Sequence, residues 1–358
     1  MDRKKKIVLI IPIVVTVVLM VIFLWNTNLE RENDSDPTIT RAHENTVNLN
    51  RLGELPDESL NLIFEPSEFV EELGSIGVRI VGSEVDSITL GTPQDTINVV
   101  VVNESLVDEN LILKIFYNYE EVQFQISGSD RYITEYLFLA PSGYDLTIPI
   151  QLDGDLEVND TINKLTVGIF WNPEYYIAIL DFHSDKFNDI TLFPGMVLNY
   201  EINYGILGEL ILPVAATVPD ALLDDLPFHS LEVNDDLELE WGVEAVVSSP
   251  QPWQVWAGEE VEMAFFTNPH GIILEEIEDY LIIAMLDWHQ IPINGKPYLL
   301  VNSIGTGQQG VFTITAPDEP GLYDFVAFMV LNPTRQRYIY TNYFPLEIST
   351  RFTLEVLE

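Results

Sequence analysis

Residues 96–119 read TINVVVVNESLVDENLILKIFYNY and contain two runs of strand-forming residues. The first run, residues 96–102, consists mainly of Val and Ile, and the second, residues 111–119, combines aliphatic with aromatic side chains. Such side chains favour an extended backbone because they pack well on a pleated surface. The segment between the runs is mostly polar, which is typical of a loop. We therefore predict two neighbouring β-strands in this stretch.

Similar runs extend the pattern on both sides. They occupy residues 78–81, 122–126, 133–139, 146–152 and 165–171. The segments between them contain clusters of Gly, Pro, Ser and Asp, which favour turns. No run combines a helical period with the length of a helix. Short strands with regularly spaced turns predict an all-β sandwich, which we place at residues 76–210.

Part of this domain is similar to a known class of module. The Val-rich run 96–103, the aliphatic run 111–115 and the turn at 140–143 before residues 146–150 follow one another in a particular order. That order resembles the adhesion-related immunoglobulin-like repeats of prokaryotic envelope proteins. The resemblance implies an immunoglobulin-like β-sandwich that takes part in adhesion at a cell surface.

A second sandwich of the same kind is predicted at residues 237–358. It follows a linker, residues 211–236, that is rich in Pro and acidic residues. Strand-like runs then occur at residues 237–247, 261–266, 280–286 and 352–357. The sequence thus predicts two tandem sandwiches.

Residues 316–325, APDEPGLYDF, resemble the tyrosine corner of immunoglobulin-like domains. The resemblance implies that the hydroxyl of Tyr323 bonds back to the main chain. Phe325 stands where an antibody domain has a cysteine, so apolar packing would replace the inter-sheet disulfide. Trp288 is the expected buried partner of that packing.

The two predicted sandwiches share a sequence feature, an apolar run that ends at an Asn-Pro. Residues 167–171 lead into Asn172-Pro173, and residues 325–331 lead into Asn332-Pro333. One interpretation is that the sandwiches are diverged copies of one module. The other is that Asn-Pro simply ends strands well, since proline cannot donate a hydrogen bond to the sheet. Near the first of these turns, the aromatic residues at 171, 175 and 176 could form a binding surface or part of the core.

Residues 7–25, IVLIIPIVVTVVLMVIFLW, contain no charge and would span about 28 Å as a helix, close to the thickness of a bilayer core. The preceding tail, residues 1–6, carries Arg3 and three Lys, which places the N-terminus in the cytoplasm. We therefore predict one N-terminal transmembrane helix, a signal-anchor, with the bulk of the chain outside the cell. The alternative is a cleaved signal peptide, whose apolar core is usually shorter and ends in small residues.

The segment that would connect this anchor to the first sandwich, residues 26–75, is mostly polar. We interpret it as a stalk. Residues 66–73, PSEFVEEL, carry signals for a short helix close to the first sandwich.

The chain is strongly acidic and contains no cysteine. Its 57 Asp and Glu against 16 Lys and Arg give a formal net charge of −41. Such a field repels nucleic acid and favours basic partners, although the acids could also be a solvated surface. Because an exported chain without disulfides is more typical of prokaryotes, we expect a bacterial or archaeal cell membrane as its location. The expected partners are the membrane, through residues 7–25, and another envelope or membrane protein.

One acidic loop carries a candidate metal site. Asp153, Asp155, Asn159 and Asp160 gather oxygen ligands within a few residues, which could bind a structural calcium ion. The loop lacks the Gly and the terminal Glu of an EF-hand, so solvated turns are the alternative. No other cofactor is expected.

Three sequons mark candidate N-glycosylation sites, at Asn33, Asn103 and Asn159. Candidate catalytic motifs are weak by comparison. Residues 305–310, GTGQQG, match a dinucleotide-binding pattern, but a strand-like run follows them instead of the helix that this pattern requires. The five histidines are scattered, and no G-x-S-x-G motif is present. We therefore expect no enzyme activity and name no catalytic residue.

The sequence favours a single-pass, membrane-anchored protein of the cell surface. Its two immunoglobulin-like sandwiches would serve adhesion, envelope structure, or the binding of proteins or glycans. The alternative is an accessory ectodomain subunit of a membrane complex for transport, secretion or glycan assembly. An extracellular hydrolase is the least favoured function.

Overall fold

The computed structural model describes just over half of the chain, all of it after residue 61. The described residues are 62–66, 76–83, 87–154, 156, 163–176, 194–204, 216–217, 241–245, 252–267, 279–302, 308–331, 333, 346–349 and 351–358. Within these ranges every regular element is a β-strand, which confirms the prediction of an all-β chain for this part. No helix in the same ranges could cross a membrane. The predicted anchor at 7–25 and the helical signal at 67–73 lie outside the described residues.

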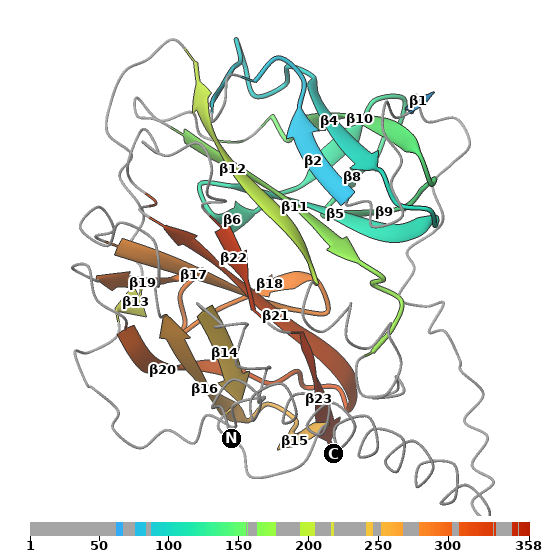
Figure 1. Ribbon diagram of the computed structural model, residues 1–358. Coiled ribbons are helices and arrows are strands. Elements are labelled where there is room, and N and C mark those ends of the chain that lie inside the picture. The colour runs from blue at the N-terminus through green and yellow to red at the C-terminus, as the bar shows by residue number, and fades with distance from the viewer. Residues whose placement is uncertain are drawn as a thin grey trace, which may run out of the picture. The chain divides into compact units, whose positions relative to one another are not determined.

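Two sheets form the first sandwich (Figure 1). Sheet A has the order β2-β4-β10-β7-β8, and β1 also pairs with β10. Sheet B has the order β3-β12-β11-β5-β6, and β9 also pairs with β5. The bounds are β1 Ile63–Pro66, β2 Ile76–Ile80, β3 Ser87–Thr89, β4 Ile97–Asn103, β5 Glu109–Tyr117, β6 Glu120–Glu121, β7 Phe124–Ile126, β8 Tyr132–Ile133, β9 Glu135–Ala140, β10 Tyr144–Leu152, β11 Asn163–Trp171 and β12 Gly195–Asn203.

Two further sheets form the second sandwich. Sheet C has the order β13-β19-β17-β21-β23-β15, with β18 on β17 and β22 on β21. Sheet D has the order β14-β16-β20. The bounds are β13 Ala216–Thr217, β14 Trp241–Ala245, β15 Trp253–Trp256, β16 Glu260–Thr267, β17 Asp279–Leu286, β18 His289–Ile291, β19 Leu299–Asn302, β20 Gln308–Thr315, β21 Gly321–Leu331, β22 Leu346–Ile348 and β23 Phe352–Leu357.

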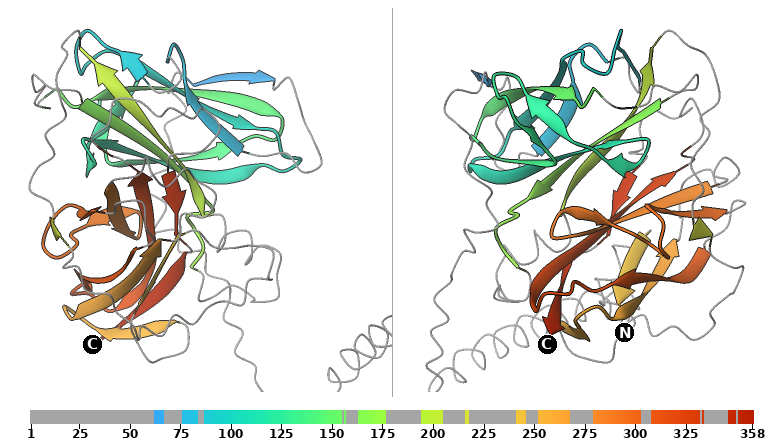
Figure 2. Two further views of the ribbon diagram at one scale, coloured as in Figure 1. Left: turned by 60° about the vertical axis from the view of Figure 1, so that its left-hand side comes forward. Right: turned by 180° about the vertical axis from the view of Figure 1, so that it is seen from behind.

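Each sandwich encloses its own hydrophobic core between its two sheets, and Figure 2 shows these layers from two further sides. In the first core, Val99 and Val101 of sheet A face Leu113 and Val167 of sheet B. The second core is built in the same way from sheets C and D. Residues at every second position of these strands reach the core, because side chains alternate between the two faces of a sheet.

The two sandwiches share one strand order. In each, a short strand runs parallel to the last long strand: β3 beside β12 in the first and β15 beside β23 in the second. The neighbouring pairs β11–β5 and β21–β17 have corresponding registers, with Trp171 opposite Leu111 and Leu331 opposite Tyr280. Both Trp171 and Leu331 directly precede an Asn-Pro. This agreement supports the prediction of two diverged copies of one module.

Two short strands belong to the sandwiches although they lie in segments predicted as connections. β1 falls within the predicted stalk and pairs with the first half of β10. β13 falls within the predicted linker and pairs in parallel with β19. Neither segment has the long strand-forming run that marks the other strands, so local sequence gave no signal for this pairing.

Candidate functional site: the junction of the two sandwiches

A third hydrophobic cluster lies on the outer faces of sheets B and C and joins the two sandwiches. Phe116 meets Phe328 edge to face with ring centroids 5.3 Å apart, and Phe170 meets Trp288 at the same centroid distance. Because this cluster covers their outer faces, β5, β11, β17 and β21 are buried on both sides over most of their lengths. The cluster consists of Ile112, Phe116, Tyr119, Phe170 and Val197 from the first sandwich and Leu281, Ile283, Met285, Trp288, Tyr298, Val326, Phe328 and Val330 from the second.

Two matching turns bring aromatic side chains into this cluster. The β5–β6 turn consists of Asn118 and Tyr119, with φ of 50° and 69°, and the β17–β18 turn consists of Asp287 and Trp288, with φ of 48° and 69°. Positive φ at both positions defines a type I′ hairpin, whose second position usually holds Gly. A non-glycine residue there costs about 1–3 kcal/mol. Burial of each ring in the junction offsets that cost.

The Tyr119 hydroxyl also bridges the sandwiches through hydrogen bonds. It donates to the main-chain oxygen of Pro333 at 2.8 Å. It accepts from the side-chain amide of Asn199 at 3.1 Å. A buried tyrosine whose hydroxyl is satisfied in this way stabilises both modules at once.

Arg351 is a second bridge, and a β-bulge places it. Three positions separate Phe325 from Phe328 on β21, whereas four separate their partners Phe352 and Ile348. The extra residue redirects the chain between β22 and β23, as bulges do. Arg351 lies within this step, and its side chain is completely buried.

The guanidinium of Arg351 donates into both sandwiches. Its Nη1 donates to the main-chain oxygens of Trp171 and Asn172 at 3.1 and 3.2 Å, and its Nη2 donates to that of Tyr175. Within the second sandwich it pairs with Asp324 at 2.7 Å. Its carbon Cζ lies 4.6 Å from the centroid of the Trp288 ring, in the geometry of a cation–π contact.

The carboxylate of Asp324 is satisfied on both oxygens. Oδ2 accepts from Arg351, and Oδ1 accepts from the Thr353 hydroxyl at 2.6 Å. The main-chain N–H of Asp324 in turn donates to Asp287 at 2.8 Å. A buried ion pair is tolerated when such additional hydrogen bonds replace the lost hydration.

A cluster of ionisable side chains forms the third bridge. The buried amine of Lys114 pairs with Glu121 and lies 3.6 Å from Glu135. These three residues come from three strands of sheet B, β5, β6 and β9. His289 of the second sandwich lies against the same two carboxylates, with Nδ1 3.6 Å from Glu121 and Nε2 3.7 Å from Glu135. We call these four residues the charged cluster. About half of the His289 side chain is exposed to solvent.

Gln290 of the β17–β18 hairpin forms hydrogen bonds with the main chain of the β5–β6 hairpin. Its side-chain oxygen accepts from the Glu121 N–H at 2.6 Å, and its own N–H donates to the Glu121 carboxylate at 2.9 Å. Its side-chain amide donates to the main-chain oxygens of Tyr119 and Pro297 at 2.9 and 2.8 Å. The two hairpins therefore exchange hydrogen bonds directly across the junction.

Within the charged cluster, the pKa of His289 is raised and that of Glu121 is lowered. The interaction with the Glu121 carboxylate raises the pKa of His289, while burial and the charge of Lys114 oppose that rise. Burial alone would raise the pKa of Glu121, but the neighbouring His289 and the hydrogen bonds from Lys114 and the Gln290 N–H lower it overall. Both shifts favour the charged forms, so the cluster acts as an ion-pair network between the sandwiches.

The predicted calcium loop is only partly described. The main-chain N–H of Asp153 donates to the oxygen of Gln123 at 3.2 Å. Asp155, Asn159 and Asp160 lie outside the described residues, so calcium at this loop stays a prediction. Among the described residues, no three His, Asp or Glu side chains are placed to hold a metal ion.

Of the three predicted glycosylation sites, only Asn103 is described, since Asn33 and Asn159 lie outside those ranges. Asn103 is completely buried. Its side-chain nitrogen, the atom that would carry a glycan, donates to the main-chain oxygens of Val107 and Ala140 at 3.0 and 2.9 Å. A glycan on this nitrogen would therefore be incompatible with the two hydrogen bonds that it donates in the folded protein.

The predicted tyrosine corner is confirmed. The Tyr323 hydroxyl donates to the main-chain oxygen of Glu319 at 2.9 Å. Phe325 is buried and stacks on Phe352 with ring centroids 4.8 Å apart, so apolar packing occupies the place of a disulfide. The predicted partner Trp288 was wrong, because its ring lies on the opposite face of sheet C, in the junction.

The other sequence-level candidates are placed as follows. Tyr176 is buried, and its hydroxyl lies 3.5 Å from the Asp287 carboxylate, while Trp171 packs against the first core, which favours packing over an aromatic binding surface. Residues 305–307 lie outside the described ranges, and residues 308–315 form β20, which confirms that a strand follows the glycine-rich segment. The interpretation of this segment as a hairpin loop was wrong, because β19 belongs to sheet C while β20 pairs with β16 in sheet D. Sequence reasoning missed the charged cluster, Gln290 and Arg351 altogether.

Comparisons with known proteins give little more. No family model and no curated protein matches the chain. Among solved structures, red sea bream transglutaminase is 10% identical over 85% of this chain with a TM-score of 0.22, and this chain spans about a third (32%) of its length. The C-terminal domain of the Streptococcus agalactiae AgI/II polypeptide BspA (10% identity, 78% of this chain, 100% of that one, TM-score 0.21) and the E. coli chaperone DraB (10%, 79%, 98%, 0.24) are also similar. At these TM-scores the likenesses support no inference about function.

Proposed function

We propose that the chain is a single-pass membrane-anchored protein of a prokaryotic cell surface, which presents two immunoglobulin-like sandwiches as one unit for adhesion or envelope structure. The observation that carries this proposal is the junction. It combines an apolar cluster, a buried arginine and an ion-pair network, all built from both sandwiches. Such a junction fixes the spacing and orientation of the two modules, which suits a scaffold that displays a binding surface.

The strand order supports the immunoglobulin-like assignment. In the first sandwich, β2-β4-β10-β7 corresponds to strands A-B-E-D, and β12-β11-β5 corresponds to G-F-C. The second sandwich repeats this order with β14-β16-β20 and β23-β21-β17. The Tyr323 hydrogen bond occurs on β21, the strand that corresponds to F, where a tyrosine corner belongs.

A role without catalysis fits how the ionisable groups are used. The buried Lys114 and Arg351 and the carboxylates of Glu121 and Asp324 are engaged in ion pairs that hold strands and modules together. A catalytic residue needs access to a substrate. We therefore propose a scaffold and binding protein in preference to an extracellular hydrolase.

The second candidate is an accessory ectodomain of a membrane complex. The rigid junction suits it equally, because such a subunit must hold its partner at a fixed distance from the bilayer. The experiment that separates the two is crosslinking of the full-length protein in its native membrane, followed by mass spectrometry of the captured proteins. Recovery alone or with wall or surface-layer material supports the free-standing scaffold, whereas one stoichiometric membrane partner supports the accessory subunit.

A further inference from the structure

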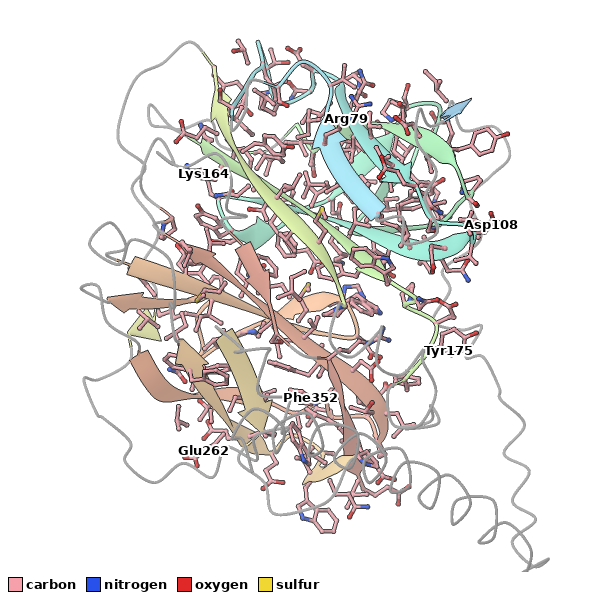
Figure 3. The ribbon with its side chains drawn as sticks, in the orientation of Figure 1. Arg79, Asp108, Lys164, Tyr175, Glu262 and Phe352 are labelled. Carbon is pink, nitrogen blue, oxygen red and sulfur yellow. The ribbon has the colours of Figure 1, made fainter. Side chains whose placement is uncertain are left out.

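Four exposed apolar side chains gather at one end of the first sandwich. Leu106 and Val107 lie in the β4–β5 loop and are 59% and 56% exposed, Leu139 near the end of β9 is 50% exposed, and Tyr144 at the start of β10 is 42% exposed. Register places them close together, because Leu139 pairs with Asn110 and Tyr144 pairs with Asn103. We call these four residues the apolar tip. Figure 3 shows Asp108 of the same loop at this end of the sandwich.

The loops that carry the apolar tip are held in one conformation. Buried Asn103 donates to the main-chain oxygens of Val107 and Ala140 and accepts from the N–H and the hydroxyl of Ser105. Ser142 connects the neighbouring loop: its N–H donates to Asp108 at 2.8 Å and its hydroxyl donates to the oxygen of Ser105 at 2.7 Å. A surface ordered before binding loses little conformational entropy when a partner docks.

The border of the apolar tip is acidic. Glu104, Asp108 and Glu109 lie in or beside the β4–β5 loop. No Lys or Arg occurs in the sequence between Arg79 and Lys114 or between Arg131 and Lys164, the two stretches that contain the tip. Arg79 itself is paired with Asp145 at 3.2 Å. Apolar side chains at the centre of an acidic border form the anatomy of a protein-binding surface with one sign of charge.

This charge selects among occupants. A second copy of this chain would bring the same acidic border and a net charge of −41 against the first, which is repulsive. An anionic membrane surface repels acids in the same way. A protein surface with an apolar centre and a basic border complements both features.

We propose that the apolar tip docks another envelope protein through an apolar segment bordered by Lys or Arg. This inference rests on the proposed location outside the cell. It adds to the scaffold function a defined contact surface and the chemistry of its partner.

The test uses the full-length protein in its native cells, with the photo-crosslinking residue p-benzoylphenylalanine in place of Leu106. The control carries it in place of Trp256, which is equally exposed, at 59%, but lies in the second sandwich. We expect a protein adduct from position 106 and none of the same mass from position 256. The crosslinked peptide of the partner should contain apolar residues next to Lys or Arg.

A charge change then tests the complementarity. In the Leu106 crosslinking background, Glu104→Lys should reduce the adduct about tenfold or more, since it turns an attraction into a repulsion. Glu262→Lys, the same change at an exposed side chain of β16 in the second sandwich, should leave the adduct unchanged. Both sites are outside the cores, so thermal unfolding should show that both variants remain folded.

Four outcomes would contradict the docking proposal: no adduct at position 106, an adduct with a second copy of this chain, an adduct with lipid, or equal loss from Glu104→Lys and Glu262→Lys. Labelling of intact cells with a membrane-impermeant reagent separates this failure from failure of the proposed function. If the chain is labelled on the cell surface but gives no adduct, only the docking proposal fails. If the chain is not labelled, its proposed location outside the cell fails as well.

Discussion

The guanidinium of Arg351 lies on the ring of Trp288, with Cζ 4.6 Å from the ring centroid. The same guanidinium reaches three main-chain oxygens of the first sandwich and the carboxylate of Asp324. One side chain of the second sandwich thus donates hydrogen bonds to the main-chain oxygens at and just after the end of β11 in the first. Because its side chain bonds to groups of both sandwiches, Arg351 is the residue at which we test the junction.

Replacement of Arg351 should destabilise the protein strongly. Arg351→Met leaves Asp324 buried without its charged partner, which typically costs about 3–5 kcal/mol of unfolding free energy. Chemical denaturation of wild type and variant measures the loss. The control is Arg79→Met, which breaks an exposed ion pair and should cost less than about 1 kcal/mol. Equal effects of the two changes would mean that Arg351 does not hold the junction.

Gly168 should tolerate no side chain. A Cβ built there would lie 2.7 Å from the Phe170 ring, which is packed against Trp288. Gly168→Ala would therefore push Phe170 out of the junction and cost about 1–3 kcal/mol, as overpacking does. Gly77→Ala is the control, because its nearest neighbour would be Val102 at an ordinary 3.8 Å. Similar unfolding free energies for both variants would argue against tight packing at Gly168.

The charged cluster should make stability depend on pH through His289. Its pKa is raised in the folded protein, so its contribution is complete below the ordinary value near 6.5 and disappears as pH rises through the folded pKa. Glu121 has a lowered pKa, so its contribution is complete above the ordinary value near 4.5 and disappears at lower pH. Between these limits both residues stabilise the junction.

Comparison of wild type with His289→Gln isolates the histidine. The difference in melting temperature should be largest near pH 5–6 and should shrink as pH rises above the folded pKa of His289. Melting curves of both proteins at a series of pH values check this. A difference that stays constant across the series would show that the histidine acts only by packing.

The tyrosine corner should contribute modestly. Tyr323→Phe removes the hydrogen bond to Glu319 from a side chain that is only partly buried, so we expect a loss of about 0.5–1.5 kcal/mol. Tyr132→Phe removes a hydroxyl from an exposed tyrosine and should be close to neutral. If the two variants have the same melting temperature, the hydrogen bond of the tyrosine corner contributes nothing measurable to stability.

The strands and the tyrosine corner could be predicted because their signals are local. Strand-forming runs such as residues 96–102 and 111–119, which mark β4 and β5, lie between turn-forming residues, and the APDEPGLYDF segment carries its turn and its Tyr within ten residues. The short β1 and β13 have no such run. They are held by pairing with β10 and β19, which lie about 80 residues further along the chain.

The junction could not be predicted, because its partners are distant in sequence. Lys114 and His289 are 175 positions apart, and Arg351 reaches residues about 180 positions earlier. One local signal does exist. Residues 111–117 and 325–331 are almost uninterrupted apolar runs, and a strand of that kind is usually buried on both faces. This reading would have indicated a covering partner on the outer faces of β5 and β21.

The sequon at Asn103 shows that a short motif does not reveal whether its side chain is buried. Three residues define the motif, but burial is decided by the loops at Val107 and Ala140 that close around the amide. The side chain that was predicted to carry a glycan instead holds the apolar tip in place.

The location of the sandwiches is the central claim, and the absence of native cysteine offers a direct measurement. A single cysteine at exposed Glu262, and in a second variant at Asp2, can be labelled with a membrane-impermeant maleimide on intact cells and after lysis. The account predicts that Glu262→Cys is labelled on intact cells, whereas Asp2→Cys is labelled only after lysis. Labelling of Glu262→Cys only after lysis would place the sandwiches inside the cell and contradict the account.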